Sequence, residues 1–362
     1  MEWRRPNGGR VCFGAGRCVE HPTAIKGRRV TAYIRSLRPL HSLRRFGLVR
    51  WVGALALGLA AVGAQAEIAV VLNSQDATVS VIQKAGYQEL RRIPVGKEPH
   101  HLMQTPAGAE LIVASSAGNE LVFLDPSTGE VKRRIANIAD PYQIGFSPDG
   151  KWFVVNALRL NRVDIYAADG FRLVKRIPLR DTPSHMAFNR AGSHVFVTLQ
   201  ESDEIAAIDL ARGEIDWRMP IGRQPAGIWM TPDDKHLLVG VMGRDYVDVV
   251  DWRARKSVKR IVTAQGAHNF QALGDRRHVL VSNRAANSIS VVDQQTLAVV
   301  DTFPVPGGPD DMEVSLDGKE LWVTNRWARS VSVVDLATRK VVRKISVGRS
   351  PHGIFFVNAA RE

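Results

Sequence analysis

The stretch Leu321-Trp-Val-Thr-Asn325 decides the fold, because its pattern returns along the chain at a constant spacing of 42 residues. Each copy is a short apolar run rich in β-branched residues, which is typical of a buried strand. The six earlier copies begin at Ala69, Leu111, Phe153, Val195, Leu237 and Val279. Seven strand-like runs at one period indicate a repeat protein of seven equal units.

Each unit contains three more strand-like segments at the same spacing. In the last unit they are Ser330-Val-Ser-Val-Val-Asp335, the alternating segment Val342-Arg-Lys-Ile-Ser-Val-Gly348, and a short segment that begins at a proline, Pro351-His-Gly-Ile-Phe355. Alternation of polar and apolar residues is expected of a half-exposed outer strand. Four strands in each of seven units predict an all-β fold, a seven-bladed β-propeller with four-stranded blades round a channel.

The two ends of the repeat array predict how the ring closes. The first unit has no proline-led strand before it, and the last proline-led strand, His352 to Val357, has no strands after it. We therefore expect the N-terminal strands to pair with the C-terminal strand in one blade. This pairing would close the ring and leave no free sheet edge.

The net charge of +13 comes mainly from the N-terminal region. Residues 1–66 contain 12 Lys and Arg against 2 Asp and Glu, which leaves 37 against 34 in residues 67–362. A propeller that is nearly neutral gives no reason to expect a nucleic-acid partner. Both cysteines, Cys12 and Cys18, lie in residues 1–42, so we expect no thiol chemistry in the propeller.

Residues 43–66 have the form of a secretory signal peptide. Arg44 and Arg45 precede an apolar run from Trp51 to Gly63, and Ala64-Gln-Ala66 suits a cleavage site before Glu67. The apolar run is too short to span a bilayer, so no membrane span is expected after cleavage. We predict a periplasmic or secreted protein, by general or twin-arginine export, and interpret residues 1–42 as an upstream extension from a mis-assigned start codon.

The repeats resemble a known family. Trp322-Val-Thr-Asn325, with Asn283 and Asn73 at the same repeat position, and the closing segment Val347 to Ile354 are similar to YVTN β-propeller repeats over residues 67–358. The resemblance implies an exported propeller. Similar propellers include plain binding proteins, the copper propellers of nitrous oxide reductase type, the propellers of haem-type nitrite reductases, and sugar-lactone hydrolases. The fold alone does not choose among these functions.

Histidines recur where the proline-led strands begin, at the expected mouth of the channel. Imidazole commonly binds copper, zinc and iron, so the pattern predicts a metal or haem site with copper or haem as candidate cofactors. The alternative is polar channel lining, because neighbouring residues of a strand face opposite ways and His100 and His101 should not both reach the axis. The histidines are His100, His101, His185, His268 and His352.

Further side chains at the same mouth predict a binding surface. Arginine and tryptophan in the loops after the second strands suit a small anionic ligand or an acidic patch on a periplasmic partner protein. Solvated loop residues are the alternative. The candidate ligand-binding residues are Tyr142, Asp310, Asp311, Arg284, Arg326, Trp327 and Arg329.

Three functions follow from these patterns. The first is a monomeric binding or scaffold protein that uses the channel face and needs no catalysis. The second is a metal- or haem-binding redox propeller. In the third, Asp310 and Asp311 act with His268 as base and acid in a lactonase-like hydrolase. The sequence contains no motif for a covalent nucleophile.

Overall fold

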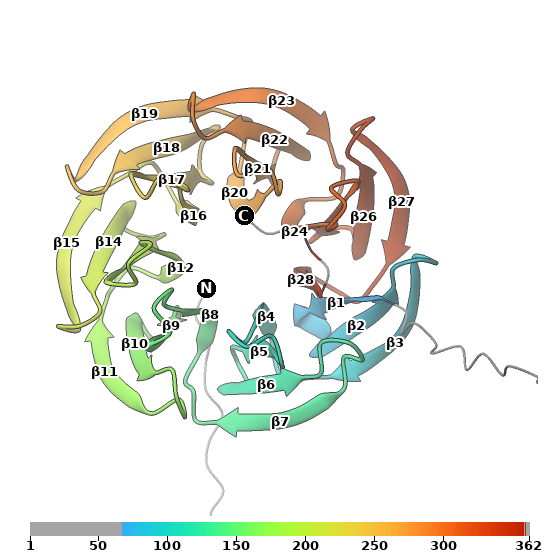
Figure 1. The fold of residues 1–362 in the computed structure, drawn as a ribbon, viewed down its shortest axis with the longest axis horizontal. Helices are drawn as coiled ribbons and strands as arrows, with labels where there is room; N and C mark the ends of the chain where they lie inside the picture. Colours follow the sequence, from blue (N-terminus) through green and yellow to red (C-terminus); the bar gives the residue numbers. More distant parts are fainter. Residues whose placement is uncertain (1–66, 358, 360–362) are drawn as a thin grey trace, which may run out of the picture. The chain divides into compact units, whose positions relative to one another are not determined.

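The computed structural model describes residues 67–357 and Ala359, which form strands, turns and one 3₁₀ helix, η1 (Ser74–Asp76). Seven antiparallel sheets of four strands stand round a common centre (Figure 1). The predicted seven-bladed propeller of four-stranded blades is therefore confirmed. The predicted extension and signal peptide lie outside the described residues. Within the described part, no helix is long and apolar enough to cross a membrane.

The innermost strand of each blade is the proline-led segment, or its counterpart that begins at Ala267. These strands are β4 (Pro99–Gln104), β8 (Pro141–Phe146), β12 (Pro183–Phe188), β16 (Pro225–Met230), β20 (Ala267–Ala272), β24 (Pro309–Val314) and β28 (Pro351–Phe356). Each of them contacts the innermost strands of the adjacent blades. Their side chains therefore meet across the channel.

The second and third strands of each blade are buried because a neighbouring blade covers each face. The second strands are β1 (Ile68–Asn73), β5 (Leu111–Ser115), β9 (Trp152–Ala157), β13 (His194–Leu199), β17 (His236–Val241), β21 (His278–Asn283) and β25 (Glu320–Asn325). The third strands are β2 (Thr78–Gln83), β6 (Glu120–Leu124), β10 (Arg162–Ala167), β14 (Glu204–Asp209), β18 (Tyr246–Asp251), β22 (Ser288–Asp293) and β26 (Ser330–Asp335).

The outermost strands face solvent and alternate exposed charged residues with apolar ones. They are β3 (Gln88–Pro94), β7 (Val131–Ala136), β11 (Leu173–Pro178), β15 (Glu214–Pro220), β19 (Lys256–Val262), β23 (Ala298–Pro304) and β27 (Lys340–Ser346). The apolar core is divided among the spaces between blades. One such cluster packs Val163 and Ile177 of one blade against Val195 and Ile208 of the next.

The ring closes as predicted, through β28 and β1. The two strands pair antiparallel, with Val70 opposite Phe355. Asn73 reinforces the closure: its Oδ1 accepts a hydrogen bond from the Gly348 backbone N–H at 2.9 Å, and its Nδ2 donates to Ser80 Oγ at 2.9 Å. A side chain at position 348 would collide with Asn73, so this close approach requires glycine.

This closure bond gives a testable difference between equivalent residues. Asn325 occupies the same repeat position and donates to Ser330 and Ser332, but its buried Oδ1 has no partner among the described residues. We expect Asn73→Ala to lower the free energy of unfolding by about 1–2 kcal/mol more than Asn325→Ala, because it also leaves a buried N–H unpaired. Urea denaturation measures both values. Equal losses would show that the Gly348 bond does not stabilise the closed ring.

Candidate functional site

A β-bulge at the start of each innermost strand directs the predicted histidines. In β4, Pro99 pairs with Ser115 and His101 pairs with Ala114, so His100 is the extra residue of the bulge. A bulge interrupts the strict alternation of side chains. His100 and His101 are both buried at the channel, with ring centroids 4.7 Å apart. The expectation that they could not both reach the axis is wrong, because it assumed a regular strand.

The structure brings all five predicted histidines together at the channel mouth, the end at which the innermost strands begin. The ring of His100 lies between those of Tyr142 and His352, with centroids 3.9 Å from each. The ring of His185 lies 5.3 Å from those of His101 and His268. None of the five is more than 7% exposed. We call His100, His101, His185, His268 and His352 the histidine cluster.

Hydrogen bonds determine which nitrogen carries the proton in His101. Its Nδ1 lies 2.7 Å from the backbone carbonyl oxygen of Tyr142, which can only accept, so Nδ1 is the donor. The lone pair of the neutral ring is then on Nε2, a buried atom without a partner among the described residues. The Nε2 of His185 is also buried without a partner among the described residues, and its Nδ1 lies 2.7 Å from Ser184 Oγ, a hydroxyl that can donate or accept.

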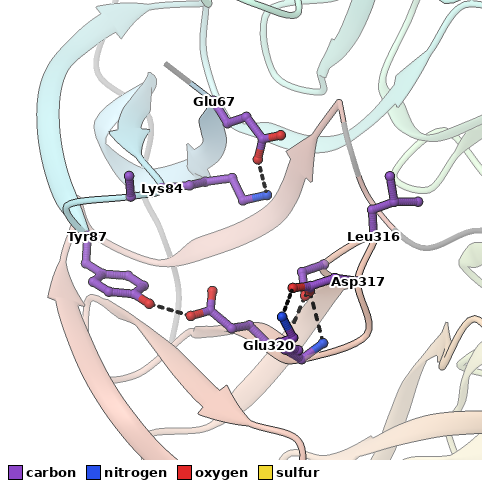
Figure 2. Close-up of a pocket in the computed structure, with 9 residues that line it drawn as sticks. Glu67, Lys84, Tyr87, Leu316, Asp317 and Glu320 are labelled. Carbon is purple, nitrogen blue, oxygen red and sulfur yellow. Dashed lines mark hydrogen bonds and ion pairs between the residues drawn. The ribbon is translucent and has the colours of Figure 1, made fainter. Parts of the chain in front are cut away.

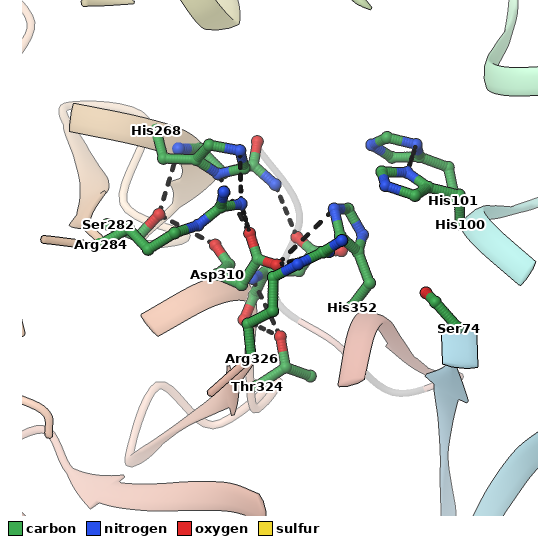
Figure 3. A network of polar contacts seen from close by, with 12 residues as sticks. Ser74, His100, His101, His268, Ser282, Arg284, Asp310, Thr324, Arg326 and His352 are labelled. Atoms are coloured by element: carbon green, nitrogen blue, oxygen red, sulfur yellow. Dashed lines mark hydrogen bonds and ion pairs between the residues drawn. The ribbon is translucent and has the colours of Figure 1, made fainter. Parts of the chain in front are cut away.

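A buried carboxylate, Asp310, lies beside His268 and His352 in the cluster (Figure 3). Arg284 donates to Asp310 Oδ1, and Arg326 Nη1 donates to Oδ2 at 3.1 Å. His352 Nε2 lies 3.7 Å from Oδ2, and its buried Nδ1 has no partner in the described part of the chain. Burial alone would raise the pKa of Asp310, but the positive charges of Arg284 and Arg326 hold it well below its usual range.

His268 differs from the other four histidines because partners face both of its nitrogens. Arg284 Nη2 lies 2.6 Å from Nε2 and must donate, so the proton of the neutral ring is on Nδ1. Nδ1 lies 3.1 Å from Asp310 Oδ1, within ion-pair distance but outside hydrogen-bond geometry. His268 therefore lies between Arg284 and Asp310 and links them.

Burial keeps the histidine cluster neutral at pH 7. Loss of hydration lowers the pKa of His101 to about 4. The same cause lowers the pKa of the other four well below the ordinary value, and nearby positive groups add to it; these four are His100, His185, His268 and His352. A neutral imidazole is the form that offers a lone pair to a metal ion.

Asp311 differs from the adjacent Asp310 in both its surroundings and its charge. Its Oδ1 accepts hydrogen bonds from Asn269 Nδ2 and from the Met312 backbone N–H, each at 3.0 Å. Burial raises the pKa of Asp311 to about 7, and the charge of Asp310 adds to the effect. Asp311 lines a cavity of about 400 Å³ that does not include the histidine cluster. The two carboxyl groups suggested for a hydrolase therefore do not share one site. Asp310 is ion-paired within the histidine cluster, whereas Asp311 lines a separate cavity.

A cavity of about 290 Å³ opens at the channel mouth and borders the histidine cluster. His100, Tyr142 and Arg326 line its inner side. This volume lies at the small end of the usual range for small-molecule sites. The remaining lining residues, from three blades, are Ser74, Gln75, Glu98, Ser116, Leu158, Arg159 and Ser350. We call this space the mouth cavity.

The arginines of the mouth are largely paired with carboxylates of the chain. Arg159 pairs with Asp140 Oδ1 at 2.7 Å and with Glu98 Oε2 at 2.5 Å. The sequence interpretation missed these two acidic partners, because Asp140 and Glu98 lie in other loops, 19 and 61 residues before Arg159. Trp327 is 61% exposed, with its indole over Gly308, where a side chain would collide. Arg329 is exposed beside it.

A larger cavity, of about 620 Å³, lies at the seam between the first and last blades (Figure 2). Its polar side chains bind one another. Lys84 Nζ pairs with Glu67 Oε2 at 2.9 Å, and the Tyr87 hydroxyl donates to Glu320 Oε1. The Tyr87 contact joins the turn after β2 to β25, so the cavity belongs to the contact between these two blades and not to the channel site.

The fold and the site together define a β-propeller with a buried, histidine-lined channel mouth. A model of the YNCE-like beta-propeller family matches residues 47–362, so the chain belongs to this family. The propeller resemblance read from the repeats is thereby confirmed.

Comparison with curated proteins gives distant relatives. The chain is 21% identical over 212 residues to protein NirF of Stutzerimonas stutzeri and to protein NirF of Pseudomonas aeruginosa. The match covers 55% of this chain and 54% of each relative, so the chain spans about half the length of the curated relatives it matches.

Comparison with solved structures supports the fold. A functionally unknown protein from Desulfotomaculum acetoxidans has a TM-score of 0.69 at 15% identity, over 80% of this chain and 98% of that one. The dihydro-heme d1 dehydrogenase NirN in complex with DHE has a TM-score of 0.60 at 17% identity, over 80% of this chain and 75% of that one. At these identities the likeness concerns the propeller fold.

Proposed function

We propose that this protein is an exported binding propeller that holds a small ligand in the mouth cavity, against the histidine cluster. The observation that carries the proposal is that His100 lines this cavity and packs against the rings of His101 and His352, at centroid distances of 4.7 and 3.9 Å. The His101 Nε2 and His352 Nδ1 atoms behind it are buried without a partner among the described residues. Buried polar atoms in folded proteins are nearly always hydrogen-bonded, so such atoms mark a place for a ligand. The similarity to NirN, whose solved structure holds DHE, agrees with a ligand-carrying propeller.

The dimensions and charges of the site limit the ligand. The mouth cavity, at about 290 Å³, suits a small ligand and does not enclose a macrocycle the size of haem. Because Arg159 and Arg326 are already paired with carboxylates, an anionic ligand would have to compete for them. A small ligand with a metal ion or a single acidic group fits these conditions best.

Export is part of the proposal and rests on the signal-like residues 43–66. Expression of the full chain in its own host should place the protein in the periplasm with Glu67 as its first residue, because Ala64-Gln-Ala66 has the form of a cleavage site. Cell fractionation and N-terminal sequencing check this. An uncleaved cytoplasmic product would contradict export.

Native mass spectrometry of the untagged protein from its own host tests ligand binding. We expect an added mass of more than about 100 Da that is lost on denaturation, as a small organic ligand requires. Gln75 is exposed at the rim of the mouth cavity, so Gln75→Trp should fill the entrance and lower ligand occupancy at least fivefold. Gln265→Trp is the matched control, because Gln265 is also exposed but lines a different cavity.

Two results would contradict the binding proposal. One is a native mass equal to that of the protein alone, or to the protein with metal only. The other is an occupancy that Gln75→Trp leaves unchanged, which would place the ligand outside the mouth cavity.

A further inference from the structure

We infer that His100, His101 and His352 bind one transition-metal ion of the copper or zinc class, and that Asp310 positions His352 for this ion. The inference rests on the proposed function, since the ion would occupy the inner side of the same site. One ring nitrogen of each histidine lies within 4.8 Å of those of the other two, and all three residues are buried. Copper and zinc bind imidazole at about 2.0–2.1 Å, so two ligands of one ion lie at most roughly 4 Å apart. A small side-chain shift is therefore enough to close the site.

The lone pair of His101 is already directed away from its backbone partner. The Tyr142 carbonyl fixes the proton on Nδ1, at 2.7 Å, and leaves Nε2 as a buried acceptor without a partner in the described part of the chain. A metal-binding histidine usually donates its other N–H to a carbonyl or carboxylate, which fixes the tautomer and the ring orientation. His101 has this arrangement before any metal is bound.

His352 faces a carboxylate, at a distance just beyond that of a hydrogen bond. Its Nε2 faces Asp310 Oδ2 at 3.7 Å, and its Nδ1 is buried without a partner among the described residues. Arg284 and Arg326 hold the Asp310 carboxylate in place from the other side. Asp310 would act on the metal only through His352, so it is a positioning residue and not a ligand.

His100 connects the ion to the mouth cavity. Its ring packs 3.9 Å from the ring of His352 and also lines the cavity, so an ion held by the three histidines would lie beside the cavity. Three protein ligands leave a fourth position open for water or a small ligand. Three imidazoles without a carboxylate ligand favour zinc or copper over magnesium or calcium.

His268 is excluded from the ligand set by its contacts. Arg284 donates to its Nε2, and its Nδ1 carries the proton of the neutral ring beside Asp310, so neither nitrogen offers a lone pair to a metal. His185 offers a buried Nε2, but it lies outside the group of three whose nitrogens come within 4.8 Å of one another. The inference thus divides the histidine cluster into three metal ligands and two residues that do not bind the metal, a distinction that the sequence pattern does not make.

Metal titration of the mature protein tests the ligand set. We expect calorimetric titration of the metal-free protein with ZnCl₂ to show one site, and His101→Gln or His352→Gln to weaken it about 100-fold or more, since each removes a ligand. Asp310→Asn should weaken binding about 10- to 100-fold, as for other residues that orient a metal ligand. His236→Gln should leave the affinity unchanged, because His236 begins β17, away from the channel.

A spectroscopic measurement on the unsubstituted protein covers the case in which a variant does not fold. Electron paramagnetic resonance of the protein with one equivalent of Cu²⁺ should show coupling to imidazole nitrogens. Absence of a stoichiometric site, a copper signal without imidazole coupling, or undiminished binding by folded His101→Gln and His352→Gln variants would overturn the inference. An organic ligand found without any metal binding would overturn only the inference, whereas a metal site without an organic ligand would overturn only the proposed function.

Discussion

Asp310→Asn is expected to lower the free energy of unfolding by about 3–5 kcal/mol, because removing one partner leaves buried positive groups without compensation. Asp310 is fully buried, and its two oxygens accept from Arg284 and Arg326. Neither guanidinium has more than 25% of its side chain exposed, so water replaces the lost carboxylate poorly. Urea denaturation of the metal-free protein at pH 7 measures the loss.

Asp311→Asn provides the matched control one residue away. Burial raises the pKa of Asp311 to about 7, so this carboxyl is substantially protonated near neutral pH and resembles an amide in charge and size. Its Oδ1 acceptor, which serves Asn269 and the Met312 N–H, is retained in asparagine. We expect a change within about 1 kcal/mol. Similar losses at both positions would show that the charge network of Asp310 does not stabilise the channel.

The metal-free protein is expected to lose stability steeply between about pH 6.5 and pH 4. In this range an unfolded histidine binds a proton, because its ordinary pKa is about 6.5, whereas the folded cluster stays neutral. Each such histidine lowers the free energy of unfolding by about 1.4 kcal/mol per pH unit as the pH falls. For His101, whose folded pKa is about 4, the total is about 3 kcal/mol across the window.

The two carboxyls modify this profile in opposite ways. Asp311 has a raised pKa of about 7, so the folded state binds a proton that the unfolded state lacks, and this offsets about one histidine between pH 7 and pH 4. The lowered pKa of Asp310 adds instability only as the pH falls below about 4. Urea midpoints at several pH values, with a chelator present, measure the slope. A His185→Gln variant should have a shallower slope, and a wild-type stability that stays constant from pH 7 to pH 4.5 would contradict buried neutral histidines.

The fold was predictable because the repeat has no insertion or deletion. A constant 42-residue spacing places the same strand at the same depth in every blade, so Leu111, Phe153 and Val195 could be assigned to second strands directly. Ring closure followed from the isolated strand that begins at Pro351, since a propeller leaves no free sheet edge. The Gly348 to Asn73 bond that stabilises this closure required the three-dimensional register.

The sequence predicted which histidines would lie together at the channel mouth, but not the contacts of each one. The repeat places the first strand of every blade next to the axis. His185 and His268 are therefore in contact although 83 residues separate them. The bulge at His100 reverses an expectation based on regular strand alternation. The proton positions depend on partners from other strands, such as the Tyr142 carbonyl and Arg284, and no sequence pattern encodes these contacts.

Anomalous X-ray diffraction from crystals of the mature protein grown with one equivalent of Zn²⁺ or Cu²⁺ tests the central claim most directly. The claim is that the channel mouth is a binding site in which the neutral histidines His100, His101 and His352 hold one metal ion. It predicts one strong anomalous peak about 2 Å from His101 Nε2 and His352 Nδ1, with His100 as the third ligand. Electron density of a bound ligand should extend from the mouth cavity to the fourth coordination position of the metal. An empty channel, with the metal only at surface histidines such as His236, would contradict it.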